Sequence, residues 1–163
     1  MEEKVIRLNK SNVLRLAIET SEGEPTGNYL EFDLEDIELP LIYQDMLDED
    51  KKNKEWLKDR ITIIEKRQDV KGKKLMSKNE EDKIKALNEF YKKEVEILDK
   101  FLGKGGVEKL LNGRKLGWTT LDEIDELISK QVAPYLDLSM DSIKDKIKDR
   151  YKIAIDRNKE VLK

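Results

Sequence analysis

The sequence predicts a mainly α-helical protein, an amphipathic helical bundle with a small N-terminal antiparallel β-hairpin. Apolar residues recur at spacings of three and four over most of the chain after residue 37, which is the helical period. Two short runs before that point alternate with a period near two, which is typical of strands. Leu, Ile, Val and Phe make up 46 of the 163 residues, more than disordered chains contain. We therefore expect most of the chain to fold.

The predicted hairpin occupies the region 1–36. Its first run contains Val13, Leu14, Leu16 and Ile18, and its second contains Tyr29, Leu30, Phe32 and Leu34. Glycine, proline and small polar residues fill the stretch 20–28 between them and predict a long turn. The segment 5–8, Val-Ile-Arg-Leu, is a candidate third strand. Because an isolated hairpin is marginal in water, we expect it to pack on helices or on a second copy.

Region 37–102 is predicted to be a charged helical hairpin. Its first helix runs from about Leu39 to Arg67, with a polar interval at 48–55 that suggests a break near Lys52. The polar stretch 66–79 predicts an exposed connection. The second helix spans about 80–102, and its apolar stripe is formed by Ile84, Leu87, Tyr91, Val95, Leu98 and Phe101 or Leu102.

Region 103–138 is predicted to be a glycine turn followed by a helical module. Glycines at 103, 105 and 106 end the preceding helix, because glycine accepts left-handed backbone at little cost. One apolar turn at 107–111 is closed by Asn112-Gly113. Thr120 predicts a new helix with Glu123 completing a capping box, and Pro134 predicts its kink or end.

Region 139–163 is predicted to be a C-terminal amphipathic helix. It starts near Met140 and ends near Leu162. The apolar positions at helical spacing are Ile143, Ile147, Tyr151, Ala154 and Val161.

Composition argues against most kinds of catalysis. The chain has no histidine and no cysteine, so it lacks the commonest general base, the thiolate nucleophile and the usual transition-metal ligands. We therefore expect no enzyme activity, no metal and no cofactor. The charges number 33 basic and 36 acidic, a balance that gives no overall attraction to nucleic acid or anionic lipid. No apolar run is long enough to cross a bilayer, and we expect a cytoplasmic protein.

Three clusters suggest chemistry, and each has a plainer explanation. The acidic groups at 45–50 and 122–126 are expected to be a solvated helix face and a favourable charge near a helix start. Gly103-Lys104-Gly105-Gly106 lacks the strand and the Ser or Thr of a phosphate loop, so we expect a tight turn between helices. Six basic residues at 66–78 lack interleaved aromatics that would stack on bases, so we expect a solvated linker.

Trp118 stands out because it lies two residues before the predicted cap at Thr120. It is interpreted either as a hydrophobic staple over the helix junction or as an exposed anchor that docks a partner. Both interpretations stay open on the sequence alone. We predict that the partner-binding surface of this module is formed by Phe101, Leu102, Val107, Leu110, Leu111, Trp118, Leu121, Ile124 and Ile128.

The order of these parts resembles the tail assembly chaperones of phages and phage-like elements in Gram-positive bacteria. The resemblance covers roughly residues 12–136. It depends on Glu31-Phe32-Asp33-Leu34 at the end of the hairpin, the apolar-glycine step at 98–103, the short apolar turn, the Asn112-Gly113-Arg114-Lys115 corner and the helix that follows. The charged insert at 66–79 and the well-patterned final helix depart from the family pattern.

The resemblance implies a helper in the bacterial cytoplasm that coats the tape measure protein and delivers it to tail tube subunits, with self-association extending the coat. A structural tail or particle adaptor that joins a neighbour through its hairpin is an alternative, and a small nucleic-acid-binding regulator acting through 66–78 is another. The chaperone hypothesis requires that an apolar seam stay available to a foreign chain.

Overall fold

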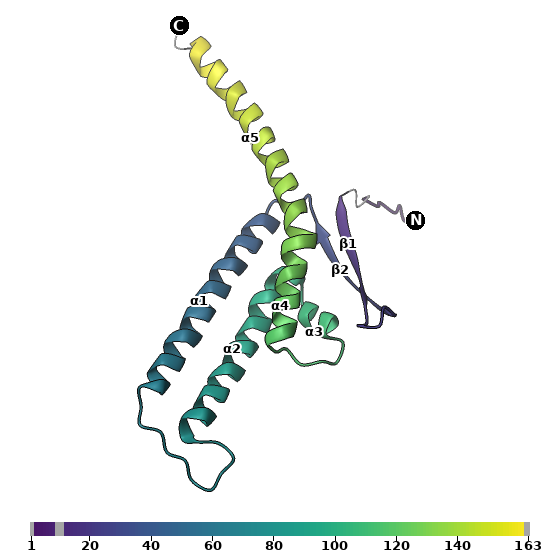
Figure 1. The fold of residues 1–163 in the computed structure, drawn as a ribbon. Coiled ribbons are helices and arrows are strands. Elements are labelled where there is room, and N and C mark those ends of the chain that lie inside the picture. Colours follow the sequence, from purple (N-terminus) through teal and green to yellow (C-terminus); the bar gives the residue numbers. More distant parts are fainter. Residues whose placement is uncertain (1, 9–11, 162–163) are drawn as a thin grey trace.

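The computed structural model describes residues 2–8 and 12–161, with side chains as far as Arg150. It is mainly α-helical with a two-stranded sheet near the N-terminus, as predicted. Two long helices lie side by side, a third helical arm crosses them, and the hairpin and a short helix lie on the other side of that arm (Figure 1).

The hairpin joins β1 (Val13–Glu19) to β2 (Pro25–Asp33) in antiparallel register, with Val13 opposite Asp33 and Leu16 opposite Leu30. The register shifts near Ile18, and the turn closes through a 2.8 Å hydrogen bond from Thr20 N to Glu24 O. The predicted third strand is wrong. Residues 5–8 form no strand, and the side chains of Val5, Ile6 and Leu8 are exposed, so no packing holds that segment against the sheet.

Helices α1 (Leu39–Glu65) and α2 (Lys78–Leu102) form the predicted antiparallel pair. The predicted break near Lys52 is wrong, because α1 runs without interruption. The polar interval contains no glycine or proline, and it is stabilised by an ion pair between Lys54 and Asp50 one turn apart. Polar composition therefore misled the prediction.

The buried face of α2 differs from the predicted stripe. Leu98, Phe101 and Leu102 are buried as expected, but Ile84 is 52% exposed. The fully buried face is formed by Ala86, Phe90, Glu94, Ile97, Leu98, Phe101 and Leu102, while Leu87, Tyr91 and Val95 of the predicted stripe are partly buried and pack against the edge of the same core. Spacings of three and four fit either of two adjacent stripes, and the carboxylate at position 94 concealed the correct one.

The turn after α2 matches the prediction. Gly103 and Gly105 have positive φ values of 95° and 72°, and α3 (Gly106–Leu111) starts directly after them. Asp99 Oδ1 accepts a 2.9 Å hydrogen bond from Val107 N, which satisfies one free amide at the start of α3. Asn112 and Gly113 are left-handed and end the short helix.

The last third of the chain is one helical arm composed of α4 (Trp118–Leu127), the π-helical turn η1 (Ile128–Val132) and α5 (Ala133–Val161). Thr120 is not the N-cap as predicted, because the capping box pairs Gly117 with Thr120 and not Thr120 with Glu123. The helix begins two residues earlier, and the Thr120 hydroxyl accepts a 2.7 Å hydrogen bond from Gly117 N. Pro134 does not end it either, because the wider π turn precedes the proline and Ala133 N donates to Ile128 O.

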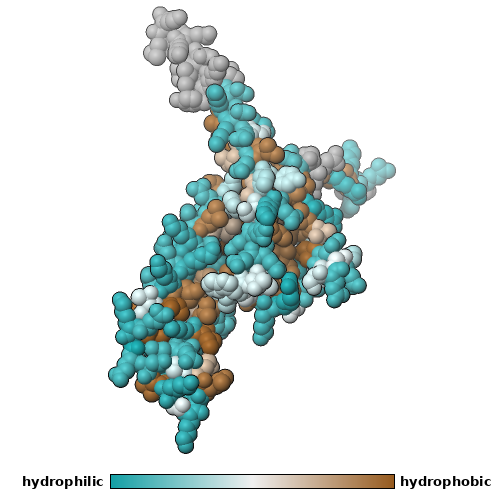
Figure 2. Space-filling view, viewed as in Figure 1, coloured by the Kyte–Doolittle hydropathy of each residue, from teal (hydrophilic) through white to brown (hydrophobic). Residues whose placement is uncertain are grey.

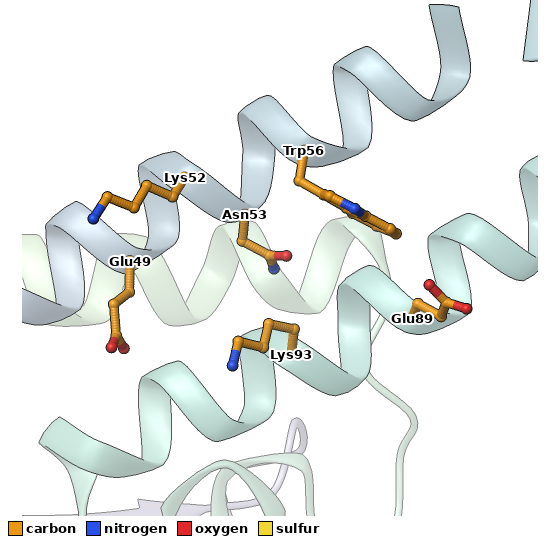
Figure 3. Close-up of a pocket in the computed structure, with 6 residues that line it drawn as sticks. All are labelled: Glu49, Lys52, Asn53, Trp56, Glu89 and Lys93. Atoms are coloured by element: carbon orange, nitrogen blue, oxygen red, sulfur yellow. The ribbon is translucent and has the colours of Figure 1, made fainter. Parts of the chain in front are cut away.

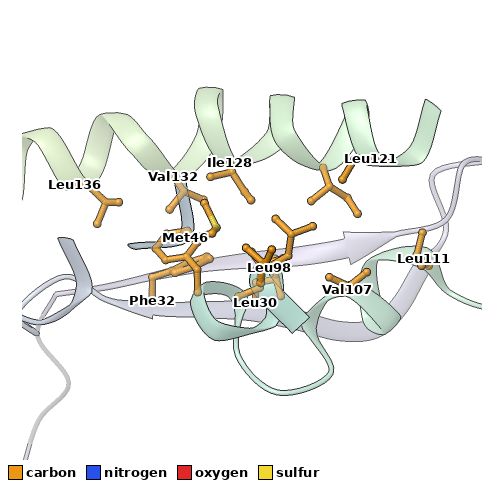
Figure 4. Packing of buried hydrophobic residues seen from close by; sticks show 14 of the residues in the cluster. Leu30, Phe32, Met46, Leu98, Val107, Leu111, Leu121, Ile128, Val132 and Leu136 are labelled. Carbon is orange, nitrogen blue, oxygen red and sulfur yellow. The ribbon is translucent and has the colours of Figure 1, made fainter. Parts of the chain in front are cut away.

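The hydrophobic core lies beneath this arm. Leu121, Ile128, Val132 and Leu136 point from the arm onto side chains of the sheet, α1, α2 and α3, as Figure 4 shows. The rings of Phe32 and Phe101 lie 5.2 Å apart at the centre of the core. The arm therefore covers the other elements with one continuous apolar stripe.

The arm continues beyond the core. From Asp141 to Arg150 every side chain except Ile143 is exposed, and α5 projects from the body. The predicted stripe positions Tyr151, Ala154 and Val161 lie outside the described side chains. Apolar side chains reach the surface where α5 leaves the body and between the long helices (Figure 2).

Candidate functional site

The predicted partner-binding residues fall into two groups. Seven of the nine are buried in the chain's own core, with exposed fractions of 8% or less: Phe101, Leu102, Val107, Leu111, Leu121, Ile124 and Ile128. Leu110 is partly buried. Trp118 is different, because 66% of it is exposed. The seam of the 101–128 module is therefore closed within the chain, and Trp118 is the candidate residue left most open to a partner.

Trp118 forms one wall of an open groove between α4 and α1. The groove has a volume of about 430 Å³ and reaches Leu57 and Ile61 of α1, Phe90 of α2 and Leu121 of α4. Its polar lining comes from Lys54, Lys58 and Thr62 on one side and Asp122 and Asp125 on the other. We call this the Trp118 groove. An apolar floor between rims of opposite charge suits an amphipathic helix.

The position of Trp118 follows from the chain just before it. Gly117 is extended, with φ −145° and ψ −171°, and it places Trp118 as the first residue of α4. A hydrophobic staple would stand before the cap and pack onto the helix. With two thirds of its surface exposed, Trp118 matches the docking-anchor interpretation better.

A buried carboxylate lies beside this groove. Glu94 is 0% exposed, and its Oε1 accepts a 2.8 Å hydrogen bond from Asn53 Nδ2. The same amide donates a 3.1 Å hydrogen bond to Phe90 O. The pKa of Glu94 is raised to about 8, mainly by burial and next by the Asp50 carboxyl group, while the hydrogen bond from Asn53 and the charge of Lys54 lower it. We therefore expect Glu94 to be largely protonated at neutral pH.

Asp50, Lys54 and Asp125 complete this polar cluster. Within the described part of the chain, Asp50 Oδ1 and Glu94 Oε2 are buried without a hydrogen-bond partner, and the nearness of the Asp50 carboxyl group is a further cause of the raised pKa of Glu94. Lys54 Nζ lies 2.8 Å from Asp50 and 3.9 Å from Asp125. Burial raises the pKa of Asp125. Asp50 and Asp125 thus belong to an internal network, although the sequence suggested a solvated face and a helix-end charge.

The carboxyl group at the centre of this cluster lies between α1 and α2 and cannot reach a substrate, whereas Lys54 and Asp125 at its edge line the Trp118 groove. Glu94 has no exposed surface with which to contact a substrate. Among the described residues, no three acidic side chains are arranged to hold a metal ion. The sequence signal for the cluster was a glutamate at helical spacing from Phe90, Ile97 and Phe101, a pattern that apolar periodicity ignores.

A second, shallower groove lies between α1 and α2, on the side of Asn53 (Figure 3). It has a volume of about 460 Å³ and is lined by Glu49, Lys52, Asn53, Trp56, Glu89 and Lys93. Trp56 is 38% exposed, and charged side chains surround it. This groove provides a natural comparison for Trp118, because it contains the chain's other tryptophan.

The basic segment 66–78 is partly neutralised. Arg67 and Lys78 both pair with Asp82, at 2.9 and 3.3 Å. Asp69 accepts hydrogen bonds from Val70 N and Asn79 N, which fix the ends of the connection. The segment is the exposed connection that the sequence predicted, and its cationic surface is smaller than the sequence suggests.

A comparison with protein-family models, curated proteins and solved structures gives no match. Within the described residues, no helix is both long enough and apolar enough to cross a membrane.

Proposed function

We propose that this protein is a phage tail assembly chaperone that binds the tape measure protein through the Trp118 groove. The single observation that carries the proposal is the exposed Trp118 above an apolar floor of Leu57, Ile61 and Phe90. Tryptophan is enriched among residues that dominate binding energy, because it buries a large area at little entropic cost. The resemblance of residues 12–136 to that family supplies the client.

The client surface that we propose lies outside the core of the 101–128 module. Burying seven of its nine residues leaves a groove whose apolar area is small and whose rims are charged. A surface of this kind suits reversible binding, since a chaperone must release its client to the tube subunits. The client expected here is one helix that places apolar side chains on Trp118 and Ile61.

Co-expression with the tape measure protein tests the proposal. We expect the wild-type chain to raise the soluble fraction of the tape measure protein, and Trp118→Ala to abolish most of that effect. Trp56→Ala is the matched control, because it removes the other exposed tryptophan from a different groove. A tape measure protein that is equally soluble without this chain would exclude the proposal.

A second measurement separates binding from folding. In the single-tryptophan variant Trp56→Phe, fluorescence reports on Trp118 alone. Adding tape measure fragments should shift its emission to shorter wavelength as the indole leaves water. If the fragments bind and the emission stays unchanged, the client uses a different surface.

A structural tail or particle adaptor is the second candidate function. Within the described residues β1 pairs with β2 alone, so the sheet keeps edges that a neighbour's strand could extend. An adaptor remains in the finished particle, whereas a chaperone leaves. Mass spectrometry of purified particles distinguishes the two, since only an adaptor would be found in amounts matching the structural proteins.

A further inference from the structure

The base of α5 forms a groove that the proposed client site does not use. This groove, which we call the α5 groove, has a volume of about 690 Å³ and lies between α5 and the end of the hairpin. It shares no lining residue with the Trp118 groove. Its α5 side is lined by Tyr135, Leu138, Ser139, Ser142, Ile143, Lys146, Ile147 and Arg150, and its other side by Asn12, Leu34, Glu35 and Ile37.

Large apolar side chains line the α5 groove yet remain in water. Ile37 is 70% exposed, Leu138 67% and Ile147 61%. Monomeric proteins seldom leave several such side chains around one hollow, and a contiguous apolar patch usually marks an interaction site. The groove is also anchored, because Ser139 Oγ donates a 2.8 Å hydrogen bond to Leu34 O and holds α5 against the β2–α1 linker.

The two walls of the α5 groove carry opposite charges. Lys146 and Arg150 stand on α5, and neither forms an ion pair within the part of the chain that is described. Glu35, which also interacts within its own chain, stands on the linker wall, and Asp36 and Glu38 follow it in the chain outside the groove lining. A partner that is only acidic, or only basic, would meet a like charge on one wall.

We propose that a second copy of this chain fills the α5 groove, with the two α5 helices antiparallel about a two-fold axis near Asp145. A two-fold axis brings the same patch of both copies together, so the basic wall of each copy can meet the acidic wall of the other. In such a pair, a residue that precedes Asp145 by a given number of positions lies opposite the residue that follows Asp145 by the same number in the second copy. Ile143 therefore contacts Ile147 of the second copy, and Arg150 of the second copy reaches the linker wall near Glu35.

This arrangement also explains why α5 projects. A helix gains most of its stability from packing an amphipathic face, and from Asp141 to Arg150 the described chain offers that face almost nothing. In the dimer, Ile143 and Ile147 of each copy cover one another. The inference does not depend on the identity of the client.

Light scattering coupled to size-exclusion chromatography tests the dimer. We expect the wild-type chain to be dimeric at micromolar concentration and Ile147→Glu to be monomeric. Ile147 is well exposed, so the substitution should leave the fold intact, which circular dichroism checks. Leu75→Glu is the matched control, because Leu75 is 89% exposed in the α1–α2 connection and should leave the dimer unchanged.

A charge exchange tests the orientation. Arg150→Glu should raise the dimer dissociation constant about tenfold, since symmetry removes two pairs of modest strength. Adding Glu35→Lys to the same chain should restore most of the affinity. A wild-type protein that stays monomeric, an Ile147→Glu variant that still dimerises, or a charge exchange without recovery would each overturn the proposal.

Discussion

The two halves of the α4–η1–α5 arm have the same apolar spacing and different surroundings. In the first half, Leu121, Ile124, Ile128, Val132 and Leu136 are each 5% exposed or less. In the second half, the continuation of the spacing reaches Met140, Ile143 and Ile147, and Ile147 is 61% exposed. The hairpin, α2 and α3 lie opposite the first half, while α5 extends beyond them.

The difference shows what periodicity measures. A spacing of three and four states which side chains share a helix face, and it leaves open what that face meets. The predicted docking residues of the 101–128 module were chosen on this spacing, and most proved to be core. The second half has the same pattern and is not covered by the described residues, which is why we propose it as a binding surface.

The largest expected effect separates the two halves by stability. Ile128→Ala should lower the free energy of unfolding by about 2–5 kcal/mol, because it leaves a cavity in a packed core. Ile147→Ala should change it by less than about 0.5 kcal/mol when measured on the monomer. Urea unfolding at low protein concentration measures both. Equal losses for the two variants would show that α5 is packed in solution.

The next effect concerns the ionisation of Glu94, whose carboxyl group is buried in the folded chain. The pKa of Glu94 is about 8 when folded and near 4.5 when exposed, so between these values the folded chain holds a proton that the unfolded chain has lost. Stability from this group is complete below pH 4.5 and falls as pH rises to 8, by on the order of 1 kcal/mol per pH unit. The burial of Asp125 raises its pKa and acts in the same direction.

Glu94→Gln isolates that contribution. The amide keeps an oxygen for Asn53 and offers a donor to Asp50, and it does not titrate. We expect the variant to match the wild type near pH 5 and to be the more stable of the two at pH 8, with a flatter profile. Thermal unfolding between these values measures it. A wild-type stability that rises from pH 5 to 8 in step with the variant would contradict the burial of a protonated Glu94.

Much of the fold was predictable because its signals are local. The hairpin turn, the two long helices and the glycine turn before α3 depend on residues close in sequence, and the structure confirms them. Errors occurred where the deciding contact was distant. Asn53 makes the centre of α1 look like a break, yet it bonds to Glu94 and Phe90, 41 and 37 residues away.

The candidate site was predictable only in part. Trp118 was identified by its place beside a helix start, but the Leu57 and Ile61 side of its groove comes from another helix. Pro134 illustrates the same limit, since the π turn that accommodates it depends on the packing of Ile128 and Val132. Sequence spacing indicates a face, and only tertiary contacts decide whether that face becomes core, groove or dimer interface.

The smallest effect tests how closely α3 packs against the end of α2, at the edge of the hydrophobic core. A Cβ added to Gly106 would lie 2.6 Å from the Cβ of Leu102, too close for either backbone to stay in place. Gly106→Ala should therefore destabilise the fold by about 1–3 kcal/mol and move α3 away from the end of α2. Gly72→Ala is its control, because nothing lies within 4 Å and the φ is unstrained. Urea unfolding of both variants measures the contrast. If Gly106→Ala lowered the free energy of unfolding no more than Gly72→Ala, α3 would be free to move, and the closely packed core would end at α2.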